Sequence, residues 1–224
     1  MSETVTIARR YRGPLTTANG GYAAGLLGGR LGGAAEVTLR LPPPLERPLT
    51  VRRDADQLLL LDGERVVAEA VPGDPSLEAP APPSPAEARA ASDGVGAFGP
   101  PRFRECFVCG VRDDGTGLGI HPGVVPGRHG LVAATWVASD VTPEVVWASI
   151  DCPGAYAVGE TGRGEPVLGR ITARVERLPD EDETCVVVGW PLGEDGRKLH
   201  AGTALYGREG DVWALARQVW ILPP

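Results

Sequence analysis

The sequence predicts an α+β fold in which one strand–helix–strands unit occurs twice in tandem. Residues 1–71 contain a strand-like segment, a glycine-rich helical segment and then several strand-like segments, and residues 102–224 repeat this order. A Pro/Ala-rich segment at 72–101 lacks hydrophobic periodicity and is expected to be a linker, extended where its prolines cluster. One helix cannot cover both faces of a long antiparallel meander, so each sheet is expected to curl around its helix. The alternative is one α+β domain without internal symmetry.

The first unit is predicted from alternating residues and one capped helix. Residues 4–12 carry β-branched residues in rough alternation, which is typical of a strand. Asn19 is a plausible N-cap for the helix that follows, whose apolar residues have helical spacing. Each interior glycine disfavours that helix by roughly 1 kcal/mol relative to alanine, so we expect it to pack closely against something such as a sheet. Further strands are expected at 35–41, 49–53, 57–61 and 65–71.

The second unit is predicted in the same way. A strand is expected at 130–139, followed by a helix with Thr142 as its cap and Pro143 in the first turn. Pro153 lies inside this helical stretch and predicts a kink or break near Asp151 and Cys152. Four strands are then expected, at 167–177, 184–191, 198–206 and 212–221.

The bulk composition excludes some classes of partner. The net charge is −7 and no Lys/Arg cluster stands out, so we expect no nucleic-acid partner. No run of about 18 apolar residues appears, so no membrane partner is expected. The first residues contain no apolar segment typical of a signal peptide, and the four cysteines resemble thiols or ligands more than a disulfide framework. We therefore expect a cytoplasmic protein.

Three short stretches resemble acyl-CoA thioesterase II-like proteins, which have a double hotdog fold. They are Asn19-Gly20-Gly21-Tyr22, Trp147-Ala148-Ser149-Ile150-Asp151 and Ala216-Arg217-Gln218-Val219. The resemblance implies that an acyl thioester binds between two hotdog units, and that Asp151 and Gln218 hold a nucleophilic water. That family also places a Thr early in the strand after the second helix. Here the matching stretch is Val167-Leu168-Gly169-Arg170, and Thr172 is shifted.

Asp151 is the best catalytic candidate by its own chemistry. A carboxylate between Ile150 and Cys152 in an apolar helix is costly unless it is paired or faces a cleft. It could act as a general base toward water or attack a thioester carbonyl directly. Alternatively, it only caps a helical segment that starts at Pro153. Gln218 could orient water beside Asp151, or it could be a solvent-facing residue on an edge.

Two further sets are candidates for substrate binding. Asn19, Gly20 and Gly21 open the first helix, where a backbone N–H could polarise a thioester oxygen. They could equally form a tight turn with an N-cap. Arg104 and Arg128 could receive the phosphates of coenzyme A, or could be ordinary surface charge.

Cys106 and Cys109 form a Cys-x-x-Cys pair, which His121 and His129 follow. These four residues are the only complete local set for zinc, but their spacing fits no standard zinc finger. The alternative is that the cysteines pack as small apolar anchors. We therefore expect no metal and no cofactor, with zinc on this set as the alternative.

These expectations favour an acyl-CoA thioesterase-like protein that hydrolyses or binds an acyl thioester. Whether it is an enzyme stays open, because the shifted Thr favours the alternative of a non-catalytic acyl-CoA or acyl-chain binding protein. A zinc-stabilised interaction module is a third hypothesis. Two units in one chain can pair their sheets internally, so both a monomer and a homodimer are compatible with the sequence.

Overall fold

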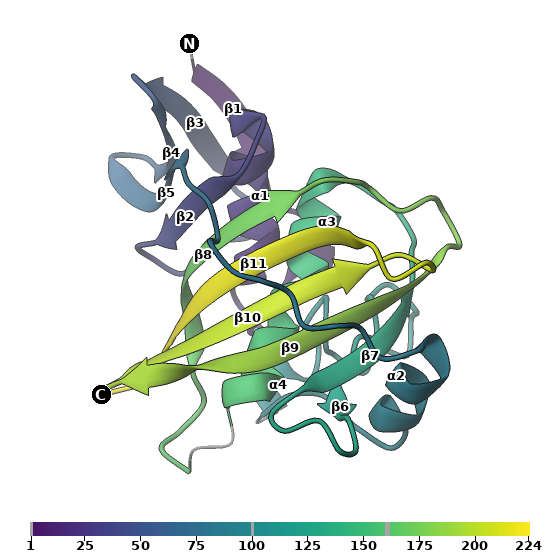
Figure 1. Cartoon of the computed structure of the whole chain (residues 1–224). Coiled ribbons are helices and arrows are strands. Elements are labelled where there is room, and N and C mark those ends of the chain that lie inside the picture. The colour runs from purple at the N-terminus through teal and green to yellow at the C-terminus, as the bar shows by residue number, and fades with distance from the viewer. Residues whose placement is uncertain (1, 100, 160–161) are drawn as a thin grey trace.

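A single antiparallel sheet forms the framework of the molecule (Figure 1). The computed structural model describes residues 2–99, 101–159 and 162–224. Within them the sheet has 11 strands in the order β1-β3-β4-β5-β2-β8-β11-β10-β9-β7-β6. The strands are β1 (Ser2–Thr6), β2 (Ala35–Leu39), β3 (Pro48–Asp54), β4 (Gln57–Asp62), β5 (Arg65–Pro72), β6 (Gly123–Val124), β7 (Val132–Val137), β8 (Val167–Val175), β9 (Thr184–Asp195), β10 (Lys198–Tyr206) and β11 (Val212–Ile221).

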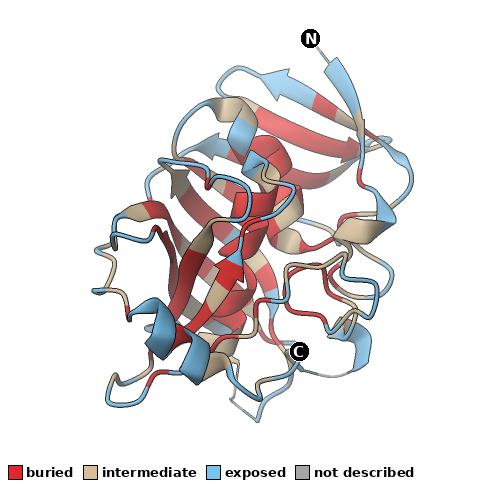
Figure 2. Ribbon diagram, turned by 90° about the vertical axis from the view of Figure 1, so that its right-hand side faces the viewer, coloured by how far each residue is buried: buried red, intermediate tan, exposed pale blue. Residues whose placement is uncertain are grey.

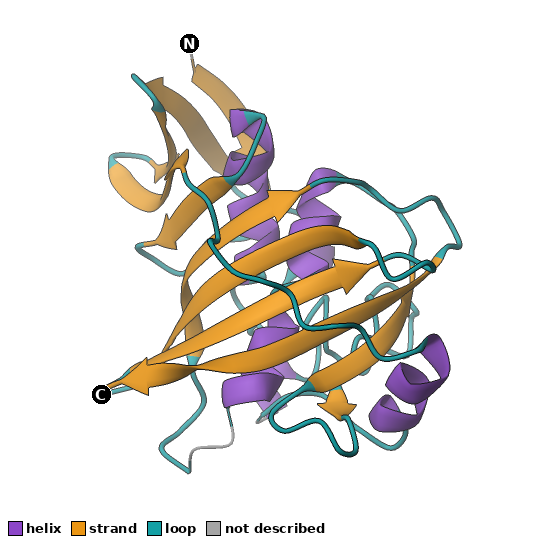
Figure 3. Cartoon of the chain, viewed as in Figure 1, coloured by secondary structure: helices purple, strands orange, loops and turns teal. Residues whose placement is uncertain are grey.

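The helices are short and few, as an α+β fold predicts (Figure 3). They are α1 (Gly20–Leu31), α2 (Pro85–Ser92), α3 (Pro143–Ser149) and α4 (Cys152–Val158), with 3₁₀ turns η1 (Arg9–Tyr11) and η2 (Pro101–Phe103). The expected strand at 4–12 therefore ends early, because its second half forms η1. No helix among the described residues combines the length and apolar character needed to cross a membrane.

The strands of the N-terminal part join those of the C-terminal part along one seam. Strand β2 pairs with β8 through four residue pairs, from Ala35 opposite Ala173 to Thr38 opposite Arg170. Strand β2 also pairs with β5 on its other side, and β8 with β11. The sheet is therefore continuous from one half of the chain to the other.

The two faces of the sheet are covered differently (Figure 2). Alternate residues of β9 illustrate this: Cys185 and Val187 belong to the main core with α1, α3 and α4, whereas Val186 and Val188 belong to a smaller apolar cluster. Ala88 of α2 lies in that smaller cluster, and Leu77 packs against it. Because successive side chains of a strand point to opposite faces, the two alternating sets of β9 residues lie in different apolar clusters.

The segment 72–101 joins the two halves as expected, but it is not extended throughout. Residues Pro85–Ser92 form α2, which begins with a capping box between Ser84 and Glu87. Before α2 the chain runs across the outer face of the C-terminal strands (Figure 1), where Tyr206 Oη donates to the carbonyl of Pro80 and Arg217 Nε donates to that of Pro75. Helix α2 could be predicted from the sequence, since Ser84-Pro85-Ala86-Glu87 is a typical helix start. The surrounding prolines made the segment look like an extended linker instead.

The glycines of α1 allow this helix to approach α3 closely. A Cβ atom on Gly25 would lie 2.7 Å from Glu144 Cα and 2.9 Å from Trp147 Cβ, and one on Gly28 would overlap the Trp147 ring. A Cβ on Gly21 would lie 2.8 Å from the Trp147 carbonyl oxygen. The close packing expected for this helix is therefore confirmed, but the surface that Gly21, Gly25 and Gly28 meet is another helix, whereas Gly20 meets Leu39 and Leu168 of the sheet.

The break predicted from Pro153 is present. Helix α3 ends at Ser149, Ile150 is its C-cap, and α4 begins at Cys152. Proline has no N–H to donate to the preceding turn, so the helix cannot continue regularly through this point. Asp151 therefore lies between two helices and not inside one.

Substituting Gly25 with alanine should destabilise the protein, because the new methyl group meets backbone of α3 that cannot rotate away. We expect Gly25→Ala to lower the free energy of unfolding by about 1–3 kcal/mol, as overpacked cores do. Gly33→Ala is the matched control, since no heavy atom lies within 4 Å of its added Cβ and its φ is not positive. Denaturant unfolding of both variants tests this; equal stability would contradict close packing at Gly25.

Candidate active site

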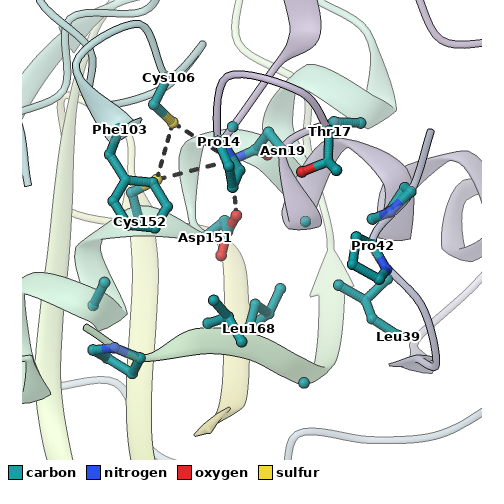
Figure 4. Close-up of a pocket in the computed structure, with 18 of the residues that line it drawn as sticks. Pro14, Thr17, Asn19, Leu39, Pro42, Phe103, Cys106, Asp151, Cys152 and Leu168 are labelled. Atoms are coloured by element: carbon teal, nitrogen blue, oxygen red, sulfur yellow. Dashed lines mark hydrogen bonds between the residues drawn. The ribbon is translucent and has the colours of Figure 1, made fainter. Parts of the chain in front are cut away.

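A cavity of about 480 Å³ lies where α1, the start of α4 and the start of β8 meet (Figure 4). Its lining includes Asn19 and Gly20 from the first half of the chain, and Asp151 and Cys152 from the second. Apolar residues such as Leu39 and Leu168 form much of the rest. The cavity therefore brings together residues that are more than 100 positions apart in the sequence.

Asp151 lines this cavity, and its two carboxylate oxygens have different surroundings. Its side chain is buried, with 2 % of the residue exposed. The oxygen Oδ2 accepts two hydrogen bonds of 2.9 Å, from the Gly21 amide and from Asn19 Nδ2. Among the described residues no group hydrogen-bonds to the buried oxygen Oδ1. The side chain also makes no capping bond to α4, so capping does not explain the choice of residue.

The burial of Asp151 sets its acidity. Loss of water raises the pKa of the carboxyl to about 7, and the hydrogen bond from Gly21 is the largest effect in the opposite direction. A carboxyl group with a near-neutral pKa beside a cavity can accept a proton from water or from a substrate.

Asn19 connects the start of α1 to Asp151. Its Oδ1 accepts a 2.8 Å hydrogen bond from the Tyr22 amide, which confirms the predicted N-cap. Its Nδ2 donates to Asp151 at the same time. The cap thus fixes the orientation of the side-chain amide, and this amide then holds the carboxylate.

The two glycines that follow Asn19 have different roles. The Gly21 amide is occupied, because it donates to Asp151. The Gly20 amide has no acceptor among the described residues, and Gly20 lines the cavity. Of the two predicted donors to a bound oxygen, Gly20 is the one that is available.

Gln218 lies beneath Asp151 and is fully buried. Its Nε2 donates to the carbonyl oxygens of Ile150, at 2.6 Å, and of Asp151, at 3.1 Å. Its Oε1 accepts from Trp220 Nε1 at 2.7 Å. These bonds to Ile150 and Asp151 involve the backbone, and Gln218 does not line the cavity. A direct role of the Gln218 amide in holding water stays a prediction. In the structure this amide bonds to carbonyl groups at the break between α3 and α4.

The stretch in which the resemblance places a threonine contributes an apolar residue to the cavity. Leu168 lines the cavity close to Asp151 in Figure 4. Thr172 is not a lining residue, and its hydroxyl donates to Glu36 Oε2 at 3.4 Å. The register of β8 against β11 shifts between Leu168 and Arg170, so the alternation reverses there, and Ile171 rather than Thr172 joins Leu168 in the main core.

Three of the four cysteines gather at one side of the cavity. Cys106, Cys109 and Cys152 are buried, line the cavity and have their Sγ atoms within 4.8 Å of one another. Hydrogen bonds with the Cys109 and Cys152 thiols lower the pKa of the Cys106 thiol. Sequence spacing could not reveal Cys152, because it reaches the pair only through the fold.

The two histidines of the alternative zinc set do not join this cluster. The His121 Nε2 atom lies 3.1 Å from the Cys109 carbonyl oxygen. His129 is exposed, and neither ring belongs to the group of mutually close ligand atoms.

The two arginines proposed for coenzyme A phosphates do not line the cavity. Arg104 is exposed, and Arg128 donates to the carbonyl of Ala81 in the connecting segment. Arg40 is the arginine that lines the cavity, and it pairs with Glu69. A phosphate site at Arg104 and Arg128 stays a prediction.

Comparison with solved structures identifies the fold. The chain aligns over its whole length with the tesB protein of Mycobacterium avium subs paratuberculosis (13 % identity, TM-score 0.64, 93 % of that chain). It aligns over 99 % with the acyl-CoA thioesterase II TesB2 of Mycobacterium marinum (11 %, TM-score 0.58, 93 % of that chain). A conserved protein of unknown function with a hot dog fold from Alicyclobacillus acidocaldarius also matches (11 %, TM-score 0.58, 100 % of this chain and 93 % of that one).

The chain has the fold of these hotdog proteins. No family model matches the sequence, and no curated protein matches it. At these identities the likeness concerns the fold, so the function must be argued from the site itself.

Replacing Gln218 with leucine should destabilise the protein, because it leaves the buried Trp220 indole N–H without its acceptor and removes one donor from the Ile150 and Asp151 carbonyls. We expect Gln218→Leu to lower the free energy of unfolding by about 1–3 kcal/mol. Gln57→Leu, at a partly exposed position of β4, is the control and should change it by less than about 0.5 kcal/mol. Equal effects in denaturant unfolding would argue against the bracing role of Gln218.

Proposed function

We propose that the protein hydrolyses an acyl thioester, with acyl-CoA as the substrate class, at the cavity beside Asp151. The observation that carries this proposal is the buried carboxylate at the cavity, with Oδ2 fixed by Asn19 and Gly21 and Oδ1 unpaired. A fixed carboxylate with one free oxygen is suited to hold and deprotonate a water. The acyl-CoA thioesterase II TesB2 of Mycobacterium marinum, which has the same fold, supports the same class of reaction.

The proposed reaction needs a nucleophile, a base and an N–H donor. Asp151 Oδ1 takes a proton from a water as the water oxygen bonds to the thioester carbonyl carbon. The Gly20 amide stabilises the resulting oxyanion, as a preorganised backbone donor does. When the carbon–sulfur bond breaks, the thiolate leaves and receives the proton from Asp151. The products are a carboxylic acid and a free thiol.

The composition of the cavity fits an acyl group better than a polar substrate. Leu168 lies close to Asp151 in Figure 4, and Leu39, Phe98 and Phe103 also line the cavity. Burial of an acyl chain against such residues contributes about 25 cal/mol per Å² of apolar surface. Arg40 is the lining residue that could approach a phosphate of coenzyme A, if its pair with Glu69 opens.

We also propose that the two halves are tandem hotdog units that place this cavity between them. The strand order from one edge is β1-β3-β4-β5-β2, and from the β7 strand it is β7-β9-β10-β11-β8. The two orders correspond strand by strand along the chain, with β6 as an extra edge strand. Helix α1 follows the first strand of one set, and α3 and α4 follow the first strand of the other.

A second candidate function is binding of an acyl-CoA without hydrolysis. It is favoured by one observation, the apolar Leu168 near Asp151 where a hydroxyl would help to hold water. The two candidates differ in turnover and not in affinity, so one set of assays separates them.

Replacing Asp151 with asparagine should abolish turnover while leaving the cavity in place. With a panel of acyl-CoAs, we expect kcat/KM of Asp151→Asn to fall by about 10²–10⁴, the usual contribution of a positioned base. Asp195→Asn, at the exposed turn between β9 and β10, is the control. Full activity of Asp151→Asn would refute hydrolysis through Asp151. If wild type is inactive but acyl-CoA raises its melting temperature, the binding function is correct.

The role of the Gly20 amide can be tested with a proline, which has no backbone N–H. Proline is well tolerated at the first position of a helix, and Asn19 already has the extended conformation that a residue before proline prefers. We expect Gly20→Pro to lower kcat by about 10²–10³, as loss of an oxyanion donor does. Gly20→Ala is the matched control, because it adds the same Cβ contacts but keeps the N–H. Equal rates for both variants would exclude the amide as a donor.

A further inference from the structure

Three buried thiols form a compact group beside the cavity. Cys106 and Cys109 come from the loop before β6, and Cys152 is the first residue of α4. Their Sγ atoms all lie within 4.8 Å of one another, and they form the one such group of potential metal ligands among residues 2–99, 101–159 and 162–224. The fold thus gathers ligands from two segments that the sequence separates.

The spacing of the sulfur atoms matches that of thiolates on a shared metal ion. The Cys106 and Cys152 sulfurs are 3.8 Å apart. Two thiolates on a tetrahedral zinc ion, each at about 2.3 Å, are separated by roughly the same distance. The structure would need little rearrangement to place an ion among these sulfurs.

The Cys-x-x-Cys loop has the backbone arrangement that thiolate ligands require. The Gly110 amide donates to the Cys106 carbonyl at 2.9 Å, and a Cβ on Gly110 would collide with that carbonyl. Glycine at this position therefore allows the tight turn of a loop whose Cys106 and Cys109 sulfurs lie close together. A fixed loop of this kind holds thiolate ligands in place for a metal.

The Asn19 side chain directs an N–H donor toward two of the sulfurs. Its Nδ2 lies 3.9 Å from Cys106 Sγ and 3.8 Å from Cys152 Sγ (Figure 4). Apolar packing of neutral thiols needs no such donor. Cys185 shows the difference: it is buried on β9, and its thiol donates to the Glu183 carbonyl.

We propose that Cys106, Cys109 and Cys152 bind one zinc ion through three thiolates, with the fourth coordination position directed to the cavity. Thiolates select zinc over harder cations. All three cysteines line the cavity, so water or a bound molecule there completes the coordination. A site with three protein ligands and one open position is the arrangement found in catalytic zinc sites. This proposal does not depend on thioester hydrolysis.

Zinc binding to the reduced full-length chain tests the proposal without any substrate. We expect one zinc ion per wild-type chain by elemental analysis, and competition with a chelator gives the affinity. Cys106→Ser, Cys109→Ser and Cys152→Ser should each weaken binding by more than about 100-fold, since loss of a group that only orients a ligand already costs about 10–100-fold. Cys185→Ser, the fourth cysteine, should bind as wild type does.

A measurement on wild type alone guards against variants that do not fold. X-ray absorption at the zinc edge should show three sulfur neighbours at about 2.3 Å. Reduced wild type that retains no zinc, a zinc ion without sulfur neighbours, or an equal loss in Cys185→Ser would each overturn the proposal. Peptide mapping that finds a Cys106–Cys152 disulfide, together with no zinc binding after its reduction, would identify a redox pair instead.

Discussion

The close contact between α1 and α3 is the constraint on which the rest of the site depends. Gly21, Gly25 and Gly28 lack side chains where α3 approaches, and the Trp147 ring fills the space beside the last of them. This approach brings the first turn of α1 within hydrogen-bond distance of Asp151. A methyl group at any of the three positions would force the helices apart and separate donor from carboxylate. The glycines of α1 lower its helix propensity, but they allow its close contact with α3 from the other half of the chain.

The second requirement is a stable interruption between α3 and α4. Pro153 prevents a continuous helix, and the freed carbonyl of Ile150 accepts hydrogen bonds from Thr203 and Gln218 instead. Strands β10 and β11 thus replace the bonds that the helix loses. These hydrogen bonds fix the position of Asp151 relative to the first turn of α1. An aspartate in an uninterrupted helix would point along the helix surface, where Gly21 could not reach it.

Much of this architecture could be predicted from local patterns in the sequence. Alternation of apolar residues predicted most strands, and Asn19 predicted the start of α1. Pro153 predicted the helix break at which Asp151 lies. The partner of the glycine-rich helix could not be predicted, because glycine shows that a neighbour is close and not what the neighbour is. The hydrogen-bond partners of Gln218 could not be predicted either, because they depend on which carbonyl groups the helix break leaves free.

The cysteines illustrate the same limit for the site. The pair Cys106 and Cys109 was visible by its spacing, and the nearby histidines completed a set by proximity along the chain. The fold instead supplies Cys152, 46 residues after Cys106. Residues that follow a break in one helix and residues of a loop in another part of the chain meet only when the sheet is assembled. Local spacing carries no information about such a meeting.

The two ends of the α1–α3 contact differ in their backbone donors. Helix α1 begins with Gly20, which has an amide hydrogen, whereas α3 begins with Pro143, which has none. Beside Pro143 the facing residue is Gly29, which offers no carboxylate. At that end Arg30 of α1 and Glu144 of α3 form an ion pair instead. The contact between these helices is therefore polar in character at both ends, but a buried carboxylate held by a backbone amide occurs at the Gly21 end.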